Sequence, residues 1–457
     1  MKRLRNDARS AMSSAIAAAE PEVDRAHLRQ ASLAGLVGTM LEQYDFVIYG
    51  TASAIIFNSL FFPDVTPAVG IIAAMSAYAV GFAARPLGGL FFSRFGDRLG
   101  RKWVLVTTLF LMGIATFAIG CLPTYHQAGI LAPILLVVCR ILQGFGAGAE
   151  QAGGVTLLAE TAGVRRRGFF TSIVFSGAAL GSVLGALAWI AAQKLPEEAL
   201  TSWGWRAVFW SSAIVTIAAY VLRRTLKESP VFAETQKARI GQESTPIGDV
   251  LRHGRAPLWR VFVINMGSNG QSYIYQVFMG SFLVTWLNVE ASFIPEILLY
   301  GALGAAVGCV LFGAATDRFG RRPVMIAVLS FLLVFPIPAF LLISTAQPIL
   351  IGLVVFVGFV VAGYGTVGSQ GAFYAEIFGA RYRYAGISLA REFSSVLGGG
   401  VAPLVCSALI TWAAGSWWPV AVYMMVMIAL SLIGAIASPE TRGRDLRIEE
   451  DAVPAGA

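Results

Sequence analysis

Seven ionisable residues lie inside long apolar stretches of this 457-residue chain, where few charges are expected. A charged side chain that faces lipid at the middle of a bilayer costs roughly 2.5 to 3.5 kcal/mol, so we expect these residues to face a cavity or one another. A purely structural ion pair is the alternative for any one of them. Arg85 lies close to one end of its stretch, and its alternative is a side chain extended to the interface. The seven are Glu42, Asp45, Arg85, Arg140, Glu150, Arg391 and Glu392.

Helical spacing places several of these charges on one face with other polar residues, because positions three, four and seven apart lie on the same side of a helix. Three stretches show this pattern, and the third suits a binding cavity because its polar groups are neutral. Polar contacts between helices without a ligand are the alternative. The first stretch aligns Thr39, Glu42, Asp45 and Tyr49, the fourth Arg140, Gln143, Ala147 and Glu150, and the seventh Asn265, Asn269, Ser272 and Gln276.

Proton transfer would require carboxylates, because His27, His126 and His253 all lie outside the apolar stretches. Burial raises the pKa of a carboxylic acid and a nearby arginine lowers it, so an approaching ligand can alter protonation. Glu42 and Asp45 are about one helical turn apart and should titrate as a coupled pair. The candidate proton-coupling residues are Glu42, Asp45, Glu150 and Glu392.

Anion binding is the chemistry that we expect of Arg140, because a guanidinium group forms two parallel hydrogen bonds with a carboxylate. Arg391 is the second candidate, although Glu392 beside it points about 100° around the helix and could serve another partner. Tyr273 and Tyr275 lie near the polar face of the seventh stretch. The candidate substrate-binding residues are Tyr49, Arg140, Gln143, Asn265, Asn269, Ser272, Tyr273, Gln276 and Arg391.

The elements that carry these residues are predicted to be transmembrane helices. The chain is 56% hydrophobic and only 13% charged, with a mean hydropathy of +0.70, which is typical of an integral membrane protein. A bilayer span needs about 20 mostly apolar residues. Twelve stretches meet this need, at about 31–57, 67–92, 103–122, 130–158, 169–193, 206–222, 261–287, 297–315, 323–344, 349–375, 384–410 and 415–437.

The basic residues indicate the orientation of these helices. Every second loop is basic, for example around Arg101, Arg166 and Arg321, so the positive-inside rule places both termini in the cytoplasm. The net charge of +8 therefore indicates topology and not nucleic-acid binding. Residues 1–30 are interpreted as a cytoplasmic tail and not as a signal peptide, because their Ala/Ser core is only weakly apolar. The four cysteines lie in apolar stretches and are interpreted as core residues.

Two internal matches predict a duplicated architecture. GDRLGRK at 96–102 corresponds to TDRFGRR at 316–322, and AETAGVRRR corresponds to AEIFGARYR at nearly the same spacing. We therefore expect two six-helix halves, 31–222 and 261–438, joined by a cytoplasmic linker at 223–260 and followed by a tail at 439–457. Such duplication is typical of secondary transporters, whose halves rock about a site near the middle of the membrane.

The repeated loops could form latches between helices at the cytoplasmic face. Asp97 and Asp317 would accept hydrogen bonds from neighbouring helix starts. We expect Glu160 to pair with Arg98 or Arg101, and Glu376 to pair with Arg318 or Arg321; plain topology signalling by arginine is the alternative. The expected gate residues are Gly96, Asp97, Arg98, Gly100, Arg101, Glu160, Asp317, Arg318, Gly320, Arg321 and Glu376.

These loops resemble the signature of the major facilitator superfamily, and RILQGFGAGAE resembles its fourth-helix arginine motif. With GTMLEQYDFVIYG, FNSLFFP, ARPLGG, GWRAVFW and SPETRGRDL, the order of motifs is similar to that of the metabolite:proton symporter family, over about residues 30–446. Members of that family carry shikimate, 2-oxoglutarate, citrate, other carboxylates, or proline and betaine. Three departures concern Gln43, Gly379 and the lack of a long heptad-rich C-terminal tail.

The resemblance implies an all-α membrane protein of twelve helices, a symporter that imports a small organic acid together with H⁺ across the inner membrane by alternating access. No cofactor, metal, catalytic residue or nucleic acid is expected, and the protein is expected to be a monomer in the bilayer. The alternatives are a proton-coupled exporter, an osmoprotectant symporter and a non-transporting membrane sensor. The exporter is disfavoured because SGAALGSVLGALAW lacks the proline of the antiporter motif, although Gly177, Gly181 and Gly185 suit tight packing.

Overall fold

The computed structural model describes residues 25–99, 101–148, 158–159, 162–225, 250–252, 254–380, 383–446, 448 and 450–453. Throughout these residues the regular secondary structure is helical. Helix occupies each of the twelve stretches predicted from the sequence. The apolar runs therefore fold as expected, since a helix satisfies its own backbone hydrogen bonds without water.

The N-terminal half of the chain, up to residue 225, consists of long helices joined by short connections. Its helices are α2 (Arg25–Ile55), α3 (Phe57–Phe61), α4 (Pro67–Leu99), α5 (Arg101–Cys121), α6 (Tyr125–Ala128), α7 (Leu131–Ala147), α9 (Arg167–Gln193), α10 (Glu197–Ala199), η1 (Leu200–Gly204), α11 (Trp205–Trp210) and α12 (Ser212–Thr225).

The C-terminal half, from residue 250, is more often interrupted, because π-helical segments (η) break three of its apolar stretches. Such segments shift the helical register by one residue and are frequent at functional sites. Its helices are α15 (Arg255–Tyr273), η2 (Ile274–Phe278), α16 (Met279–Trp286), α17 (Phe293–Phe319), α18 (Arg321–Val334), α19 (Pro336–Ile343), α20 (Pro348–Val357), η3 (Gly358–Gly365), α21 (Thr366–Ile377), α22 (Arg383–Ser395), η4 (Val396–Val401), α23 (Ala402–Trp412) and α24 (Trp418–Ile436).

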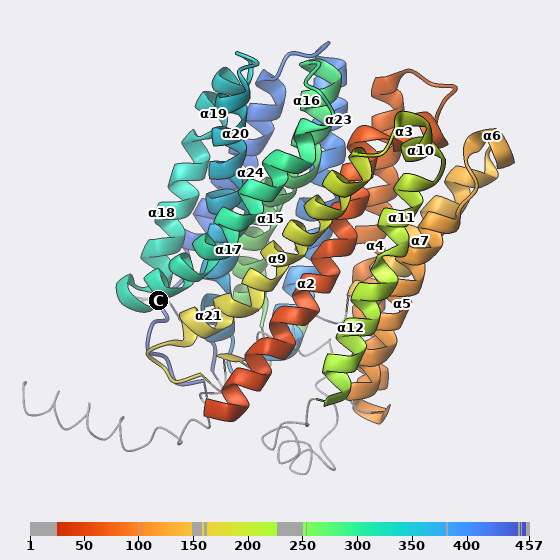
Figure 1. Ribbon diagram of the computed structural model, residues 1–457. Coiled ribbons are helices and arrows are strands. Elements are labelled where there is room, and N and C mark those ends of the chain that lie inside the picture. The colour runs from red at the N-terminus through yellow and green to blue at the C-terminus, as the bar shows by residue number, and fades with distance from the viewer. Residues whose placement is uncertain are drawn as a thin grey trace, which may run out of the picture.

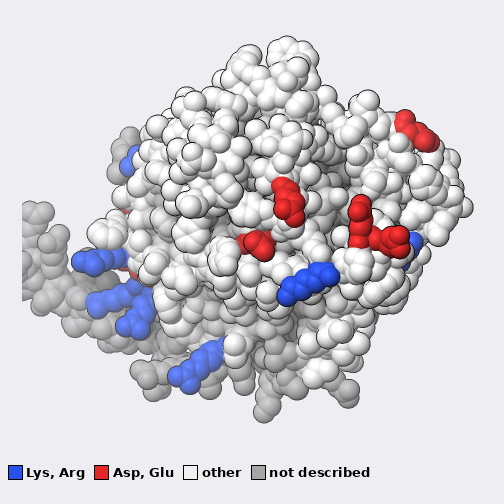
Figure 2. Space-filling model, turned by 45° about the horizontal axis from the view of Figure 1, so that its top comes forward, with Lys and Arg blue, Asp and Glu red and all other residues white. Residues whose placement is uncertain are grey.

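Six helices of the described part are long and apolar enough to cross a membrane, namely Pro67–Phe92, Arg167–Gln193, Phe293–Phe319, Pro348–Ile377, Ala385–Trp412 and Trp418–Ile436. The pair α18 and α19, bent by 43° next to Pro336, would be a seventh. α2 and α15 are not among them, and both carry predicted polar faces that lower their hydropathy. Large apolar side chains such as Ile214, Ile349 and Trp412 are exposed, and Figure 2 shows a surface mostly free of charged residues.

The two halves lie side by side, each with its own hydrophobic core. One large cluster of buried apolar residues is built mainly from α2 to α11 and the other mainly from α15 to α24. Figure 1 shows α2 and α9 running together through the middle, with α4, α5, α7 and α12 on one side and α15 to α24 on the other. α9 also packs on α17, and α4 on η4, so these helices join the halves.

Glycines bring two pairs of helices into backbone contact, as small residues do in membrane bundles. A Cβ atom on Gly181 of α9 would lie 2.1 Å from the carbonyl oxygen of Met40 in α2. A Cβ atom on Gly144 of α7 would lie 1.8 Å from the carbonyl oxygen of Gly81 in α4. The second contact sets α7 so closely against α4 that Arg140 lies beside Gly81.

Candidate functional site: buried charges where the halves meet

Arg85 of α4 joins three helices through a buried chain of ion pairs. Its Nη1 lies 2.9 Å from Glu42 Oε1 of α2, and its Nε donates to Glu392 Oε2 of α22 at 3.0 Å. Arg85 and Glu42 are each 2% exposed, and Glu392 is 5% exposed. The guanidinium also lies over the rings of Phe46 and Phe82, at 5.5 and 5.3 Å. One arginine therefore holds carboxylates from both halves of the chain.

The interpretation of Arg85 as a side chain that extends to the interface is wrong. Arg85 is 2% exposed, and carboxylates of α2 and α22 hold its guanidinium inside the protein, so the side chain does not extend to the membrane interface. The carboxylates of Glu42 and Glu392 balance the positive charge of the buried Arg85. Without them the buried charge would be strongly destabilising. The sequence identifies Arg85 as an embedded charge. Its partners could not be predicted, because the sequence does not show which helices pack on α4.

Arg140 of α7 is fully buried and enclosed by aromatic rings. Its Cζ lies 4.1 Å from the ring centroid of Tyr49, 4.8 Å from that of Tyr78 and 5.3 Å from that of Phe46. A guanidinium is attracted to the faces of such rings. Tyr49, a predicted substrate-binding residue, therefore lies against Arg140, and α2 and α4 supply the walls of this enclosure.

Gln143 forms a hydrogen bond with one nitrogen of the Arg140 guanidinium. Its Oε1 accepts a hydrogen bond from Arg140 Nη1, and its Nε2 donates to Thr116 Oγ1 of α5 at 2.7 Å. The two other nitrogens, Nε and Nη2, have no hydrogen-bond partner among the described residues. They face Gly81, where a Cβ atom would lie 3.2 Å from both. Buried donors normally have hydrogen-bond partners, so these two nitrogens, which we call the open edge of Arg140, are donors available to an acceptor.

Asp45 lies one turn from Glu42 on α2, and the two carboxylates line the same small cavity. The cavity lies between α2, α5 and α12, and its other lining residues include Met112, Gly113 and Thr216. Asp45 is 6% exposed. The predicted pair is thus brought together in the N-terminal half, with Glu42 also turned to Arg85. Glu150, the other candidate carboxylate of this half, lies outside the described residues.

The polar face of the seventh stretch divides into two groups. Asn265 Nδ2 donates to Ser394 Oγ at 2.7 Å, and Asn269 Nδ2 donates to Ser395 Oγ at 2.8 Å, so both join α15 to α22. These contacts agree with the alternative interpretation of the polar face, in which its residues link helices and bind no ligand. The π-helical segment η2 begins at Ile274, just beyond this part of the face.

The second group connects the two halves. Gln276 Nε2 donates to Ser272 Oγ at 2.6 Å, and its Oε1 accepts a hydrogen bond from Gln43 Nε2 of α2 at 2.8 Å. Gln43 is one of the three departures from the family pattern. Gln276 lies within the π-helical segment η2, about three helical turns after Asn265, and its side chain faces α2.

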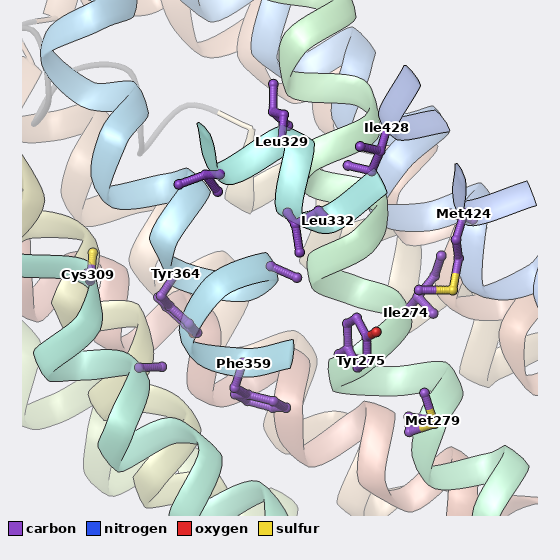
Figure 3. Close-up of a cluster of buried hydrophobic side chains, with 14 of the residues drawn as sticks. Ile274, Tyr275, Met279, Cys309, Leu329, Leu332, Phe359, Tyr364, Met424 and Ile428 are labelled. Atoms are coloured by element: carbon purple, nitrogen blue, oxygen red, sulfur yellow. The ribbon is translucent and has the colours of Figure 1, made fainter. Parts of the chain in front are cut away.

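The two tyrosines near this face lie on opposite sides of the helix. The ring of Tyr273 packs 5.1 Å from that of Phe82 and 6.3 Å from that of Tyr78, next to the Arg85 and Arg140 sites. Tyr275 points instead into the core of the C-terminal half, among Ile274, Met279 and neighbouring apolar side chains (Figure 3). The expectation that Tyr275 lies near the site is wrong, because helical residues two positions apart point about 200° apart, to opposite sides.

Arg391 precedes Glu392 on α22 and is 8% exposed. Its Cζ lies 4.9 Å from the ring centroid of Phe175 of α9, so this guanidinium also lies between the halves. Arg391, Glu392, Arg85 and Glu42 consequently form one group of charges drawn from α2, α4 and α22.

A second charged network closes the end of the bundle at which α17 gives way to α18, which we call the basic end. Glu376 of α21 is fully buried and accepts hydrogen bonds from Arg321 Nε at 3.0 Å and from Arg167 Nη1 at 2.8 Å. Of the two predicted partners, Arg321 is therefore the one bonded to Glu376. Arg318 is exposed and lies over the ring of Phe319.

Asp317 caps the start of α9 across the two halves. Its Oδ1 accepts from Gly168 N at 2.9 Å, its Oδ2 accepts from Phe169 N at 2.8 Å, and Arg321 Nη1 lies 2.6 Å from Oδ1. These are the helix-start hydrogen bonds predicted from the sequence. Gly320 has a φ of 104°, a conformation that favours glycine, at the turn between α17 and α18.

Sequence reasoning missed part of the basic-end network. Arg167 of AETAGVRRR donates to Glu376 in the other half, and the C-terminal segment contacts Arg167 through the carbonyl oxygen of Arg444 and Glu376 through Thr441. Glu440 accepts from the backbone N–H groups of Arg321 and Arg322, and Thr441 Oγ1 donates to Glu376 Oε2 at 3.0 Å. Glu440 and Thr441 belong to the SPETRGRDL motif, but nothing in the sequence identified the residues that they bind.

The corresponding motif of the N-terminal half is described only in its backbone. Gly96, Asp97 and Arg98 fall in α4 and Arg101 begins α5, but the side chains of these residues lie outside the described part of the structure. Gly100 and Glu160 lie outside it altogether. The predicted pairing of Glu160 with Arg98 or Arg101 therefore stays a prediction.

Membrane-length helices in two halves, with buried charges where the halves meet, define a multi-pass membrane transporter. The sequence model of the Major Facilitator Superfamily matches residues 35–403, and the chain belongs to this superfamily. The curated relatives that it matches are transporters and not enzymes, so transport is also the class of activity of this chain.

Two relatives and one solved structure illustrate the similarity. The shikimate transporter of Escherichia coli (strain K12) is 35% identical over 424 residues, covering 91% of this chain and 95% of that protein. The proline/betaine transporter of the same organism is 32% identical over 438 residues, covering 93% and 86%. The structure of the proton:xylose symporter XylE bound to 6-bromo-6-deoxy-D-glucose has a TM-score of 0.73 at 18% identity, covering 93% and 98%, which shows the shared fold.

Proposed function

We propose that this protein is a proton-coupled symporter that imports a small organic acid across the inner membrane by alternating access. Arg140 would bind the substrate carboxylate, with Tyr49 and Gln143 fixing the guanidinium. Glu42, Asp45 and Glu392 would carry the proton, with Glu150 a further candidate. Ser272, Tyr273 and Gln276 would face the rest of the substrate, and Arg391 would supply a second positive charge.

The open edge of Arg140 is the observation that supports this proposal most directly. Nε and Nη2 are two parallel donors, fully buried and without a protein acceptor among the described residues. A carboxylate matches such an edge with two charge-assisted hydrogen bonds. The relative named as a shikimate transporter carries an acid of this chemical class. Glycine at position 81 keeps the space beside the edge free of a Cβ atom.

The proposal includes the topology predicted from the sequence. Twelve spans would form halves at 31–222 and 261–438, with the linker 223–260, the tails 1–30 and 439–457 and both termini in the cytoplasm. The basic end would then be the cytoplasmic end, since Arg167, Arg321 and Arg322 gather there. Gly96, Asp97, Arg98, Gly100, Arg101 and Glu160 would form the matching gate of the N-terminal half. The transporter would act as a monomer.

Import of proline or betaine is the second candidate function. Relatives named as proline/betaine transporters match 93% of this chain, and a zwitterion such as proline also carries a carboxylate for Arg140. Its cationic group would need a negative or aromatic partner, and Asp45, Tyr49 and Tyr78 are near. Proline and betaine therefore need a partner for their cationic group as well as for the carboxylate, whereas an organic acid needs only the second.

Uptake of labelled compounds into proteoliposomes tests both candidates. The panel is shikimate, 2-oxoglutarate, citrate, a benzoate, proline and betaine, each with and without an inward proton gradient. We expect accumulation of one acid that depends on the gradient. Accumulation of betaine, which lacks a free amine but keeps a carboxylate, would favour the second candidate. Gradient-driven efflux in place of uptake would contradict import.

A further inference from the structure

Two buried glutamines, Gln43 of α2 and Gln276 of η2, join the two halves through their amide groups, and we call them the amide pair. Gln43 Nε2 donates to Gln276 Oε1 at 2.8 Å, and Gln276 Nε2 donates to Ser272 Oγ at 2.6 Å. Gln43 is 7% exposed and Gln276 is 8% exposed. Both ends of the Gln276 amide are therefore hydrogen-bonded, and one of the two partners belongs to the other half.

The amide pair lies close to the open edge of Arg140. Phe46 follows Gln43 by about one turn of α2, and its ring centroid lies 5.3 Å from Arg140 Cζ. Tyr273 precedes the glutamine of η2 by about one turn, and its ring lies 6.3 Å from the ring of Tyr78. The ring of Tyr78 in turn lies 4.8 Å from Arg140 Cζ. The amide pair and the guanidinium thus border the same layer of aromatic side chains, so one small molecule held between the halves can contact both.

Any motion that separates the halves must also separate the two glutamines, because one stands on each side. Each amide would then lose a hydrogen-bond partner, and a buried polar group left unpaired is costly. Apolar contact continues beside the pair, since a Cβ atom on Gly50 of α2 would lie 3.2 Å from Val277 Cγ2 of η2. The separated amides therefore need a polar group that comes from the ligand.

A hydroxyl group can replace the bond between the two glutamines. Its oxygen accepts from Gln43 Nε2 and its proton is donated to Gln276 Oε1, whereas a methylene group in the same place can do neither. A keto oxygen accepts from Gln43 alone. Gly363 of η3 leaves space beside the pair, since a Cβ atom there would lie 3.7 Å from Ser272 Oγ and 3.9 Å from Gln276 Nε2. The amide pair is therefore complementary to a hydroxyl group and not to an apolar one.

We propose that the amide pair determines substrate specificity: it selects an organic acid that carries a hydroxyl group, and this hydroxyl group takes the place of the bond between Gln43 and Gln276. Arg140 binds the carboxylate while the amide pair binds the hydroxyl group, so the substrate itself connects the two halves. Gln43, which is absent from the candidates predicted from the sequence, becomes a binding residue. The inference rests on the proposed binding of a carboxylate by Arg140 and adds the second group that the substrate must carry.

Affinities for matched pairs of acids test this inference. One pair is shikimate and cyclohexenecarboxylate, and the other is citrate and tricarballylate; the second member of each pair lacks the hydroxyl groups of the first. Isothermal titration calorimetry of the full chain in detergent gives Kd for each acid without requiring transport. The variants are Gln43→Met and Gln276→Met, because methionine is also unbranched but has no amide. Gln271→Met is the matched control, since Gln271 of α15 is buried and its Nε2 donates to the carbonyl oxygen of Met424 within the C-terminal half at 3.3 Å.

We expect the parent protein to bind the hydroxylated member of one pair about tenfold to a hundredfold more tightly than its analogue. Gln43→Met and Gln276→Met should each lower this ratio about tenfold, because an apolar side chain no longer distinguishes the two acids. Gln271→Met should keep the parent ratio. A purely structural contact between the halves would weaken both acids equally and leave the ratio unchanged.

Two results would overturn the inference. The first is a parent protein without preference in either pair, including one that binds none of the four acids. The second is a parent-like ratio in Gln43→Met, and Gln276→Met decides in the same way if Gln43→Met does not fold.

Uptake assays on the same proteins separate this inference from the proposed function. If proteoliposomes accumulate an acid under a proton gradient but the parent shows no preference for the hydroxylated acids, the proposed function stands and the inference fails. If the parent shows the preference and Gln43→Met loses it, but no acid accumulates under the gradient, the inference stands and proton-coupled import is wrong.

Discussion

Arg85 and Arg140 are both buried arginines, but their surroundings assign them different tasks. Arg85 is balanced by Glu42 and Glu392, so its charge is satisfied within the protein. Arg140 is bonded to the neutral Gln143 and faces aromatic rings, and two of its nitrogens have no acceptor among the described residues. Arg85 therefore links the two halves through ion pairs. Arg140 keeps two donors that suit an anionic ligand.

Replacement of Arg140 by lysine should weaken substrate binding while the protein still folds. Lysine keeps the positive charge but cannot offer two parallel donors, and hydrogen bonds to charged groups contribute about 1.5 to 3 kcal/mol each. We therefore expect KM for the acid to rise about tenfold to a hundredfold, measured by initial rates of uptake in proteoliposomes.

Arg318→Lys is the matched control, because Arg318 is exposed at the basic end and contacts only the ring of Phe319 in the described contacts. It should leave KM unchanged. An unchanged KM in Arg140→Lys as well would show that the carboxylate binds elsewhere, with Arg391 as the next position to examine.

The residue types of the site could be predicted from the sequence, but not their partners. Embedded charges are conspicuous against an apolar background, so Glu42, Arg140 and Glu392 could be recognised without a structure. The pairing of Arg85 with Glu392 could not, since the two are 307 positions apart and only helix packing brings them together. Arg167 was missed for the same reason.

Among the helices, glycines determine where the charged side chains stand. Gly144 places α7 against the backbone of α4 next to Gly81, and Gly181 places α9 against α2. The hydropathy pattern predicted the positions of these helices well, because apolar length is a property of the chain alone. The π-helical segments η2, η3 and η4 could not be predicted, because they depend on packing between helices that the sequence does not specify.

Gly144→Ala should destabilise the protein, because the added Cβ would lie 1.8 Å from the Gly81 carbonyl oxygen and the helices must separate. Overpacking of this kind typically costs about 1 to 3 kcal/mol. The control is Gly352→Ala in α20, where nothing lies within 4 Å and alanine should maintain or slightly raise stability.

Thermal unfolding in detergent measures both variants. Equal melting temperatures for Gly144→Ala and Gly352→Ala would show that the close contact of α4 and α7 is not needed in the folded state.

For the whole molecule, the network at the basic end should control access from that side. Glu376 neutralises Arg321 of its own half and Arg167 of the other half. Glu376→Gln leaves both arginines without this carboxylate, which typically costs about 3 to 5 kcal/mol for a buried pair. The closed state should therefore be less populated.

The measurement is the rate at which a membrane-impermeant thiol reagent labels a cysteine in place of Ser172, a fully buried residue of α9, in the Cys121→Ser background. We expect faster labelling in Glu376→Gln and no change in the control Glu296→Gln, which alters an exposed carboxylate at the start of α17. The exchange of charges in Arg321→Glu with Glu376→Arg should not restore closure, because Arg167 would then face a second arginine. Full restoration would show that Arg167 is not part of the latch.

The central claim, coupled entry of an organic acid and a proton, can be tested by following the pH of a lightly buffered suspension of proteoliposomes when the salt of the acid, adjusted to the pH of the medium, is added without any imposed gradient. We predict that the external medium becomes more alkaline as the acid enters, and that Glu392→Gln abolishes this change while the parent shows it. Uptake of the acid without a pH change, or acidification of the medium, would contradict proton symport.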